Sequence, residues 1–273
     1  MVSVQINNYK FGYPEKMEEL TADQLLGLGR NFHRLRDQIE TQWILFLEFV
    51  KPHWGKMGKN IMQLDLESKD DEKRLRDQEL MIALAELNLF LLDRNCCSKI
   101  LLPVFDFGGK KYYGPADRID SSTIMEYAYA EYLFWDYIYK QKERSLTELV
   151  AVLYRKKGHA NPGDENYRGD LRCGFNKLNV NGDADELTLL PAEIKKAILI
   201  QYIGIRNWIA DKYPVLFPVM EGNVQVEEKY PEWAGVAHNL PAPKFGTIEE
   251  AERANVHVVL RFIEDGMIKK RAA

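Results

Sequence analysis

The sequence predicts a mainly α-helical protein of about six helices with one small β-hairpin. Capping boxes, in which Ser or Thr stands three residues before Glu or Gln, begin several of its apolar segments. Gly108-Gly109 separates two short β-type runs, as in a two-residue hairpin turn. Strands do not alternate with helices along the chain, so we do not expect a parallel sheet.

The N-terminal part is expected to contain a short strand and two long helices. Residues 2–6 alternate apolar and polar side chains, which indicates a strand. The Thr21/Gln24 pair begins a helix that should continue to residue 50, because the Lys-Pro pair after it cannot extend it. A second helix is expected over residues 70–93, acidic at its start and apolar further on.

Two glycines, Gly27 and Gly29, lie inside the first of these helices. Glycine is a poor helix former, so the pair could weaken the first turns. The alternative is that the missing side chains permit close packing against another element. No third glycine and no preceding strand accompany them, so they do not form a dinucleotide-binding fingerprint.

The segment YYGPADRIDSSTIMEYAYAEYLFWDYIYK, residues 112–140, is the most informative part of the chain. A Gly-Pro turn comes first, and a capping box at Thr123 then begins a helix that runs to about Lys140. Apolar side chains cover the helix nearly all round, which is typical of a buried helix. We expect Tyr127, Trp135 and Ile138 to be largely buried.

The same helix carries three acids, Glu126, Glu131 and Asp136, spaced by five residues. Successive carboxylates should therefore point about 140° apart around the helix axis. Paired carboxylates in acid–base catalysis must converge, so this helix does not supply such a pair by itself. We interpret the three residues as solvated acids or as acids that stabilise the helix N-terminus.

The remaining chain is expected to alternate helices with coil. Helices are predicted over residues 145–154, over residues 191–212, and from Thr247 to Gly266. A long loop should cover 155–189 and Pro- and Gly-rich coil 214–246. These elements give three segments, 1–69, 70–213 and 214–273, which we expect to form one compact unit.

Two metal sites can be considered and neither has the required spacing. NVNGDADE, residues 179–186, looks like a calcium loop, but the positions that need Gly and Glu hold Ala184 and Leu190. A polar turn fits better. A zinc site assembled from Cys96, Cys97, Cys173 and His159 has no supporting motif, so we expect no metal and no cofactor.

Composition excludes several function classes. A net charge of −4 gives no electrostatic footprint for nucleic acid. The longest apolar run is too short and too polar to span a membrane, and the N-terminus does not resemble a signal peptide. We therefore expect a cytoplasmic protein. No nucleophile, kinase or hydrolase motif is present, so we expect no enzyme.

Aromatic residues, which favour protein interfaces, make up 11% of the chain and are clustered. A non-enzymatic protein with this composition is expected to bind partners through some of these side chains. The candidates for partner binding are Tyr129, Tyr132, Tyr137, Trp208 and Trp233.

The order YYGPADRIDSSTIMEYAYAEYLF, LTELVAVLYR and LPAEIKKAILIQYIGIRNWI resembles proteins of phages and prophages of Bacteroidetes-type bacteria. Residues 233–265 resemble the ending that such proteins carry, and the likeness begins near residue 80. In those genomes the proteins are encoded among the tail genes, near the tape-measure gene. The family has no established activity, so the resemblance transfers no catalytic residue.

The resemblance implies a tail-assembly chaperone that binds tail proteins such as the tape measure and the tail tube, in the host bacterial cytoplasm. Homo-oligomers are compatible with this role. One alternative is a structural minor tail or virion component. A second is an enzyme whose composite site is not visible in sequence. Gene position is association rather than mechanism, so the three hypotheses stay open at this point.

Overall fold

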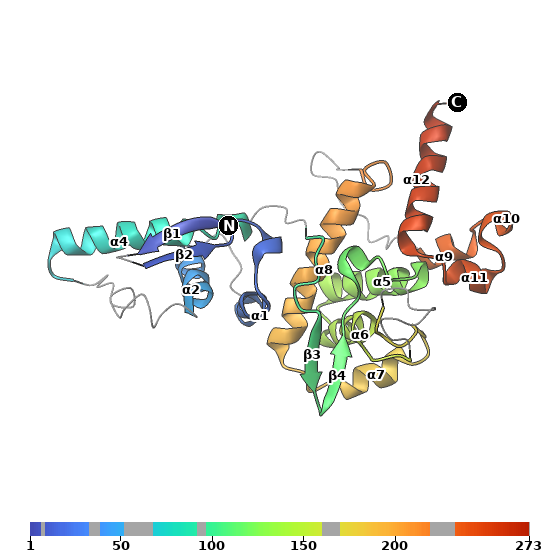
Figure 1. Cartoon of the computed structure of the whole chain (residues 1–273), viewed down its shortest axis with the longest axis horizontal. Helices are drawn as coiled ribbons and strands as arrows, with labels where there is room; N and C mark the ends of the chain where they lie inside the picture. The colour runs from blue at the N-terminus through green and yellow to red at the C-terminus, as the bar shows by residue number, and fades with distance from the viewer. Residues whose placement is uncertain are drawn as a thin grey trace. The chain divides into compact units, whose positions relative to one another are not determined.

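The computed structural model describes residues 1–6, 9–32, 39–51, 68–91, 97–159, 170–218 and 233–272. The chain divides into two compact units. The first contains Met1–Cys97 and Ala192–Gly204, and the second contains Ser98–Pro191 and Ile205–Ala273. The fold is mainly helical, as predicted, and the described residues contain more than the expected six helices (Figure 1).

The first unit combines a β-hairpin with helices. Its predicted N-terminal strand is present and pairs antiparallel with a second strand, so that Val2 lies opposite Tyr13. The elements are β1 (Val2–Ile6), β2 (Tyr9–Tyr13), a 3₁₀ turn (Met17–Glu19), α1 (Ala22–Arg30), α2 (Ile39–Val50), α4 (Asp71–Glu86) and a second 3₁₀ turn (Leu89–Leu91). Helix α4 packs on α2, and both belong to the first unit.

Helix α1 begins as predicted but ends early. The Thr21 hydroxyl accepts from the Gln24 amide at 3.2 Å, and the Gln24 side chain accepts from the Thr21 amide at 2.9 Å. The helix ends at Arg30, where the Asn31 side chain donates to the Gly27 carbonyl at 3.0 Å. An Asn side chain that bonds the last carbonyls competes with helix continuation. The prediction of one helix reaching residue 50 is therefore wrong.

Close packing explains one of the two glycines of α1. A Cβ placed on Gly29 would lie 2.1 Å from the Glu193 carbonyl oxygen and 2.9 Å from the Ala197 amide nitrogen. Both contacts belong to α8 (Ala192–Lys212), and Glu193 and Ala197 lie in the part of that helix assigned to the first unit. Only glycine allows the two backbones to approach this closely. The packing alternative therefore holds at Gly29.

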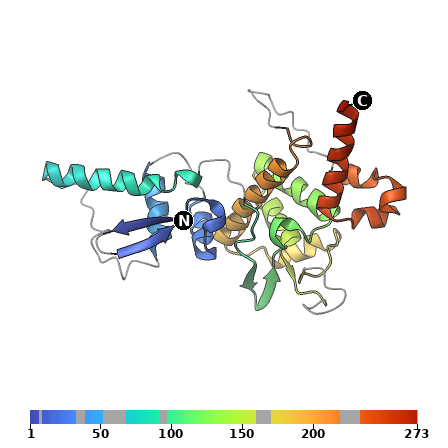
Figure 2. The same cartoon turned by 45° about the horizontal axis from the view of Figure 1, so that its top comes forward.

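The second unit is built around α5 and α6, which lie side by side (Figures 1 and 2). Gly108 and Gly109 have φ of 57° and 73°, so the predicted hairpin turn is confirmed, and a third strand extends the hairpin to the sheet order β3-β4-β5. The elements are β3 (Val104–Phe107), β4 (Lys110–Tyr113), a 3₁₀ turn (Asp117–Ile119), α5 (Ile124–Lys140), α6 (Glu143–Leu153), β5 (Arg155–Lys156), α7 (Val180–Glu186), the end of α8, α9 (Trp233–His238), α10 (Ala242–Phe245), α11 (Ile248–Glu252) and α12 (Val256–Ala272).

Three regions of the second unit differ from the prediction. The expected loop 155–189 contains α7, because Val180, Ala184 and Leu187 fall on one helical face and are all buried. Neither a polar turn nor a calcium loop therefore occupies residues 179–186. The expected coil 214–246 contains α9 and α10, and the expected last helix is two helices, of which α12 continues through Gly266.

The core of the second unit is where α5, the end of α8 and α12 meet. Its buried members include Ile124, Tyr127, Ile205, Val256 and Leu260. The prediction that Tyr127 is buried is confirmed at 3% exposure, whereas Trp135 and Ile138 are only partly buried. The core therefore fixes one side of α5 and leaves another side at the surface.

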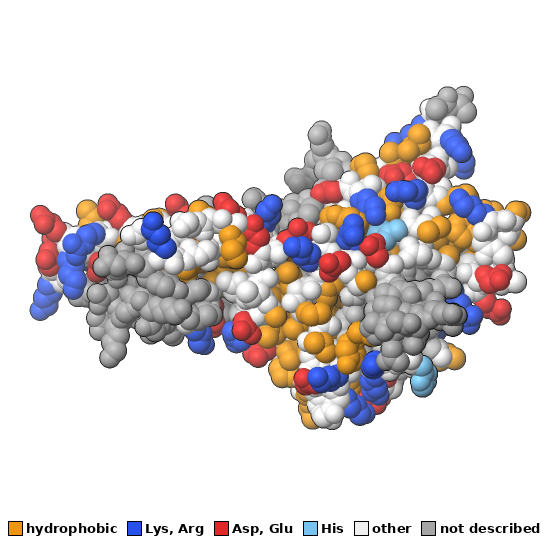
Figure 3. All heavy atoms as spheres, viewed as in Figure 1, with side chains coloured by type: hydrophobic (Ala, Val, Ile, Leu, Met, Phe, Trp, Pro, Cys, Tyr) orange, Lys and Arg blue, Asp and Glu red, His pale blue; other side chains and the backbone are white. Residues whose placement is uncertain are grey.

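Two features bear on the environment of the protein. None of the helices in the described ranges is long and apolar enough to cross a membrane. On the face seen in Figure 3, acidic and basic side chains are intermixed over the described surface. This mixture agrees with the mild net charge of −4.

Candidate functional site on helix α5

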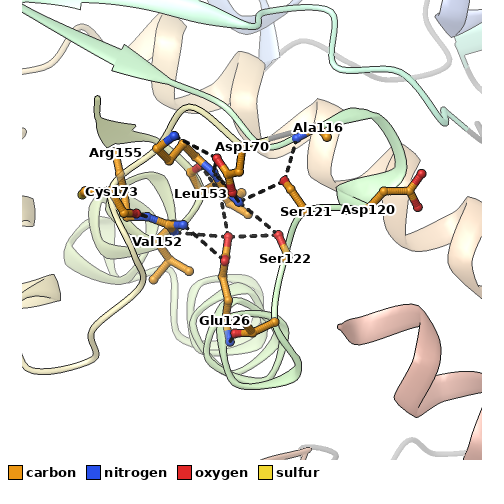
Figure 4. Close-up of polar contacts among 12 residues, drawn as sticks. Ala116, Asp120, Ser121, Ser122, Glu126, Val152, Leu153, Arg155, Asp170 and Cys173 are labelled. Atoms are coloured by element: carbon orange, nitrogen blue, oxygen red, sulfur yellow. Dashed lines mark hydrogen bonds and ion pairs between the residues drawn. The ribbon is translucent and has the colours of Figure 1, made fainter. Parts of the chain in front are cut away.

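The N-terminal turn of α5 holds a buried carboxylate, Glu126, at the centre of a charge network (Figure 4). The Thr123 hydroxyl caps the helix by accepting from the Glu126 amide at 3.1 Å. The Glu126 carboxylate instead accepts from Arg172 at 2.6 Å and lies 3.2 Å from an Arg155 nitrogen. The Ser122 hydroxyl donates to the same carboxylate at 3.0 Å.

The two guanidinium groups have further partners of their own. Arg172, whose side chain is fully buried, donates to both carboxylate oxygens of Asp170 at 2.9 and 2.7 Å and to the Leu153 carbonyl at 2.8 Å. Arg155 donates to the Cys173 carbonyl at 2.8 Å and to the Val152 carbonyl. The network therefore contains two acids and two arginines with no net charge. It connects the start of α5, the end of α6 and residues 170–173.

The network holds Glu126 in its charged form. Burial by itself would raise the pKa of Glu126, but the charges of Arg172 and Arg155 outweigh burial and hold the pKa below its usual value. A general acid or base at neutral pH needs a pKa near the operating pH. Glu126 therefore fits a structural role better than proton transfer.

The other two acids of α5 are also buried and paired, which corrects the sequence interpretation of solvated or helix-terminal acids. Glu131 is 2% exposed and accepts two hydrogen bonds from Arg206 of α8, at 2.6 and 3.0 Å. Asp136 is 4% exposed, accepts from the Ser145 hydroxyl at 2.5 Å and lies 2.7 Å from the Lys140 ammonium. As predicted, the three carboxylates do not converge, since each binds a different set of partners.

A stripe of aromatic side chains covers the outer side of α5. It consists of Tyr129, Tyr132, Trp135 and Tyr139, which are spaced by three or four residues and so share one face of the helix. Tyr132 is 50% exposed and Tyr139 is 41% exposed. We call these four residues the aromatic stripe.

Ring contacts hold the aromatic stripe in place. Tyr139 stacks on Trp135 with ring centroids 5.2 Å apart. The ring centroid of Tyr129 lies 6.3 Å from that of Tyr132 and 6.1 Å from that of Phe175. Phe175 comes shortly after Arg172 and Cys173 of the charge network in the sequence. The Arg206 guanidinium that binds Glu131 lies 4.8 Å from the centroid of Trp135. The same buried contacts that fix α5 therefore also orient the exposed rings.

The structure separates the five candidates for partner binding into two groups. Three of them are at least partly exposed. Tyr129 and Tyr132 belong to the aromatic stripe, and Trp208 is half-buried, with its ring centroid 5.7 Å from that of His257. Tyr137 and Trp233 are 3% and 5% exposed, so the structure corrects these two candidates to core residues.

Sequence reasoning missed Trp135 and Tyr139 as surface candidates. The available signal was that Tyr139 lies seven residues after Tyr132, which places both on one side of the helix. The aromatic side chains all round the helix concealed this pattern, because Tyr127 and Tyr137 point into the core from the other side.

Comparison with known proteins found no match for this chain. No protein-family model matches the chain, and no curated protein and no solved structure resembles it significantly. Within the described residues, no three His, Cys, Asp or Glu side chains gather as metal ligands would, and Cys96 of the considered zinc set lies outside those residues.

Proposed function

We propose that this protein is a non-enzymatic phage tail assembly factor that binds a tail protein, such as the tape measure, through the aromatic stripe of α5. The observation that carries the proposal is the exposure of Tyr132 and Tyr139 on one face of a helix whose other side is buried. Tyr and Trp are enriched at protein interfaces and among the residues that dominate binding energy.

Rigidity of the stripe supports binding. Two ion pairs join α5 to residues that are distant in sequence: Glu126 binds Arg172, and Glu131 binds Arg206 of α8. A surface that is already ordered loses less conformational entropy when a partner binds. The stripe therefore offers anchors that need little rearrangement.

The length of the stripe suits a helical partner. Residues 129–139 extend for about 15 Å along the axis at 1.5 Å per residue. An amphipathic helix presents anchors at three- and four-residue spacing over a similar length. A tape-measure protein with long amphipathic helices would provide such a partner, and the resemblance to tail-cluster proteins makes it our choice.

The binding role is favoured over an enzyme by the state of the buried acids. Glu126, Glu131 and Asp136 are each engaged by a cationic side chain. Acid–base catalysis needs carboxylates that can exchange protons with a substrate. Paired in this way, the three acids serve the stability of α5.

Co-purification tests the proposal. The tagged protein is co-expressed with the tape-measure protein of the same phage, as wild type, as the double variant Tyr132→Ser/Tyr139→Ser, and as the control Leu189→Ser. Leu189 is 85% exposed and lies outside the stripe, so it matches the loss of exposed apolar surface. We expect the double variant to retain about tenfold less tape-measure protein and the control to match wild type. Equal capture by all three proteins would contradict the proposal.

Mass spectrometry of purified particles separates the assembly factor from a structural tail component. An assembly factor leaves the particle, so its peptides should be absent from mature virions. Peptides present at the level of known tail proteins would instead favour the structural alternative.

A further inference from the structure

A small basic pocket lies in the second unit, where the end of α8 meets α10 and α12. Its cavity volume is about 290 Å³. Figure 3 shows Lys and Arg side chains gathered around a histidine close to the start of α12. The lining residues are Lys212, Tyr213, Lys244, His257, Arg261, Phe262 and Asp265, together with Val258. We call these residues the basic pocket, and none of them belongs to the aromatic stripe.

Three cations of the basic pocket, Lys212, Lys244 and Arg261, come from three different helices. Among the described residues, none of the three forms an ion pair with a carboxylate. The Lys212 ammonium lies 4.6 Å from the Trp208 ring centroid, and the Lys244 ammonium lies 4.2 Å from that of Phe262. Aromatic faces hold both ammonium groups in position without neutralising them.

Several basic side chains elsewhere in this unit are paired with acids. Lys110 and Lys156 both contact Glu186, at 2.7 and 2.8 Å, and Arg144 contacts Asp185 at 2.6 Å. The basic pocket, in contrast, is lined by three cations that form no ion pair with any described carboxylate. Like charges held together repel one another, and an anion bound between them would relieve that repulsion.

The side chain of Lys212 is partly buried in the pocket. Burial lowers the pKa of Lys212, the Asp120 carboxylate counteracts this, and the charges of Arg118 and Arg261 lower the pKa further. Asp120 is already engaged, because its carboxylate lies 3.3 Å from Arg118 and 3.2 Å from His257. An additional anion next to Lys212 would stabilise its charged form.

One wall of the pocket is a fixed, neutral histidine. Burial lowers the pKa of His257 below its usual value, although the hydrogen bond to the Arg118 carbonyl opposes this. Its Nε2 donates to that carbonyl at 2.8 Å, so its Nδ1 accepts from the Tyr213 hydroxyl at 3.0 Å. Both rings are thus held by hydrogen bonds at one wall of the pocket.

Charge and size indicate the class of ligand. The three cations and the Asp265 carboxylate give a formal charge of +2 among the lining residues, with His257 neutral. A phosphate monoester carries a charge of about −2 at neutral pH, whereas a monocarboxylate would leave one cation unbalanced. The Asp265 carboxylate is an acceptor for a hydroxyl donor, and a hydroxylated phosphate ester can place a hydroxyl there at a distance from its own phosphate.

We propose that the basic pocket binds a small hydroxylated phosphate monoester, with the phosphate between Lys212, Lys244 and Arg261 and a hydroxyl donating to Asp265. This inference is independent of the proposed tail-assembly function, since it uses no residue of the aromatic stripe. Ligand binding there would join α8, α10 and α12 through one anion.

Isothermal titration calorimetry at low ionic strength tests the inference with three probes, glycerol 3-phosphate, inorganic phosphate and acetate. We expect one glycerol 3-phosphate per chain, weaker binding of inorganic phosphate, and weakest binding of acetate. Arg261→Gln and Lys212→Gln should each weaken glycerol 3-phosphate binding about tenfold or more, as removal of a charge-assisted hydrogen bond predicts. The control Lys177→Gln removes an exposed lysine that lines a different cavity and should leave binding unchanged.

Asp265→Asn tests the hydroxyl contact separately. It should strengthen the binding of inorganic phosphate, because a repulsive carboxylate is removed, and reduce the preference for glycerol 3-phosphate. Circular dichroism of each variant checks that the fold is retained. The inference is overturned if wild type binds neither phosphate probe saturably, if Lys177→Gln weakens binding as much as Arg261→Gln, or if both phosphate probes bind wild type equally.

Discussion

At the scale of single residues, the second unit depends on charges that are buried and fully paired. Glu126 and Arg172 are the central pair, with their closest atoms 2.6 Å apart. Buried ion pairs add little to stability compared with apolar packing, but removing one partner leaves the other charge buried and uncompensated. Stability should therefore respond strongly to single changes at these positions.

Replacing Glu126 by Gln should destabilise the protein severely. The substitution keeps the shape of the side chain but leaves Arg172 and Arg155 without their shared anion, so we expect a loss of about 3–5 kcal/mol in the free energy of unfolding. Urea unfolding followed by circular dichroism measures it. The control Asp185→Asn breaks an ion pair whose acid is 70% exposed and should change stability by less than about 1 kcal/mol. Equal effects of the two substitutions would contradict the structural role of Glu126.

The same network predicts how stability depends on pH. Because the pKa of Glu126 in the folded protein lies below the ordinary value of 4.5, its contribution to stability is complete above about that pH and is lost as the pH falls through the folded pKa. The pKa of Asp170 is also lowered, with Arg172 outweighing burial, and acts in the same direction. Urea unfolding at a series of pH values should show stability falling below about pH 4.5, and Glu126→Gln should make that fall shallower. A wild-type slope that Glu126→Gln leaves unchanged would argue against this assignment.

At the scale of elements, the sequence predicted helices where their ends are set locally. The start of α5 follows from Thr123 and the hairpin from Gly108-Gly109, because a cap and a two-residue turn involve only neighbouring residues. The end of α1 was missed because the polar side chain of Asn31 stops the helix there. Helix α7 was missed because polar residues surround its few buried positions.

The partners of the buried acids could not be read from the sequence at all. Arg172 lies 46 residues from Glu126, and Arg206 lies 75 residues from Glu131. Helical periodicity gives the direction of a side chain around its own axis but not what another element brings to it. Among the aromatic candidates, only the fold shows that Tyr132 is exposed and Tyr137 is buried.

The close contact of α1 with α8 gives a prediction at this scale. In Gly29→Ala the new methyl group would lie 2.1 Å from a backbone oxygen, so the two helices must separate and we expect a clear loss of thermal stability, of about 1–3 kcal/mol. Gly266→Ala in α12 is the matched control, because nothing lies within 4 Å of its added Cβ. Alanine favours helix over glycine, so this control should be neutral or more stable by up to about 1 kcal/mol. Differential scanning calorimetry distinguishes the two, and a stabilising effect of Gly29→Ala would contradict the packing described.

At the scale of the whole molecule, the proposals assign different roles to different surfaces of the second unit. The aromatic stripe would bind a tail protein, and the basic pocket would bind a phosphate ester. Both surfaces rest on helices that are fixed by buried contacts, since α5 is held by ion pairs and α12 by core packing of Val256 and Leu260. Binding at the stripe is the central claim.

Site-specific photo-crosslinking in phage-infected cells tests that claim most directly. A benzophenone amino acid replaces Tyr132 in one variant and Leu189 in another, so that both probes are exposed on the same unit. After illumination during tail assembly, the account predicts a crosslink from position 132 to the tape-measure protein or another tail protein, and none from position 189. Crosslinks to tail proteins from position 189 alone, or none from position 132 while normal tails still form without the protein, would contradict it.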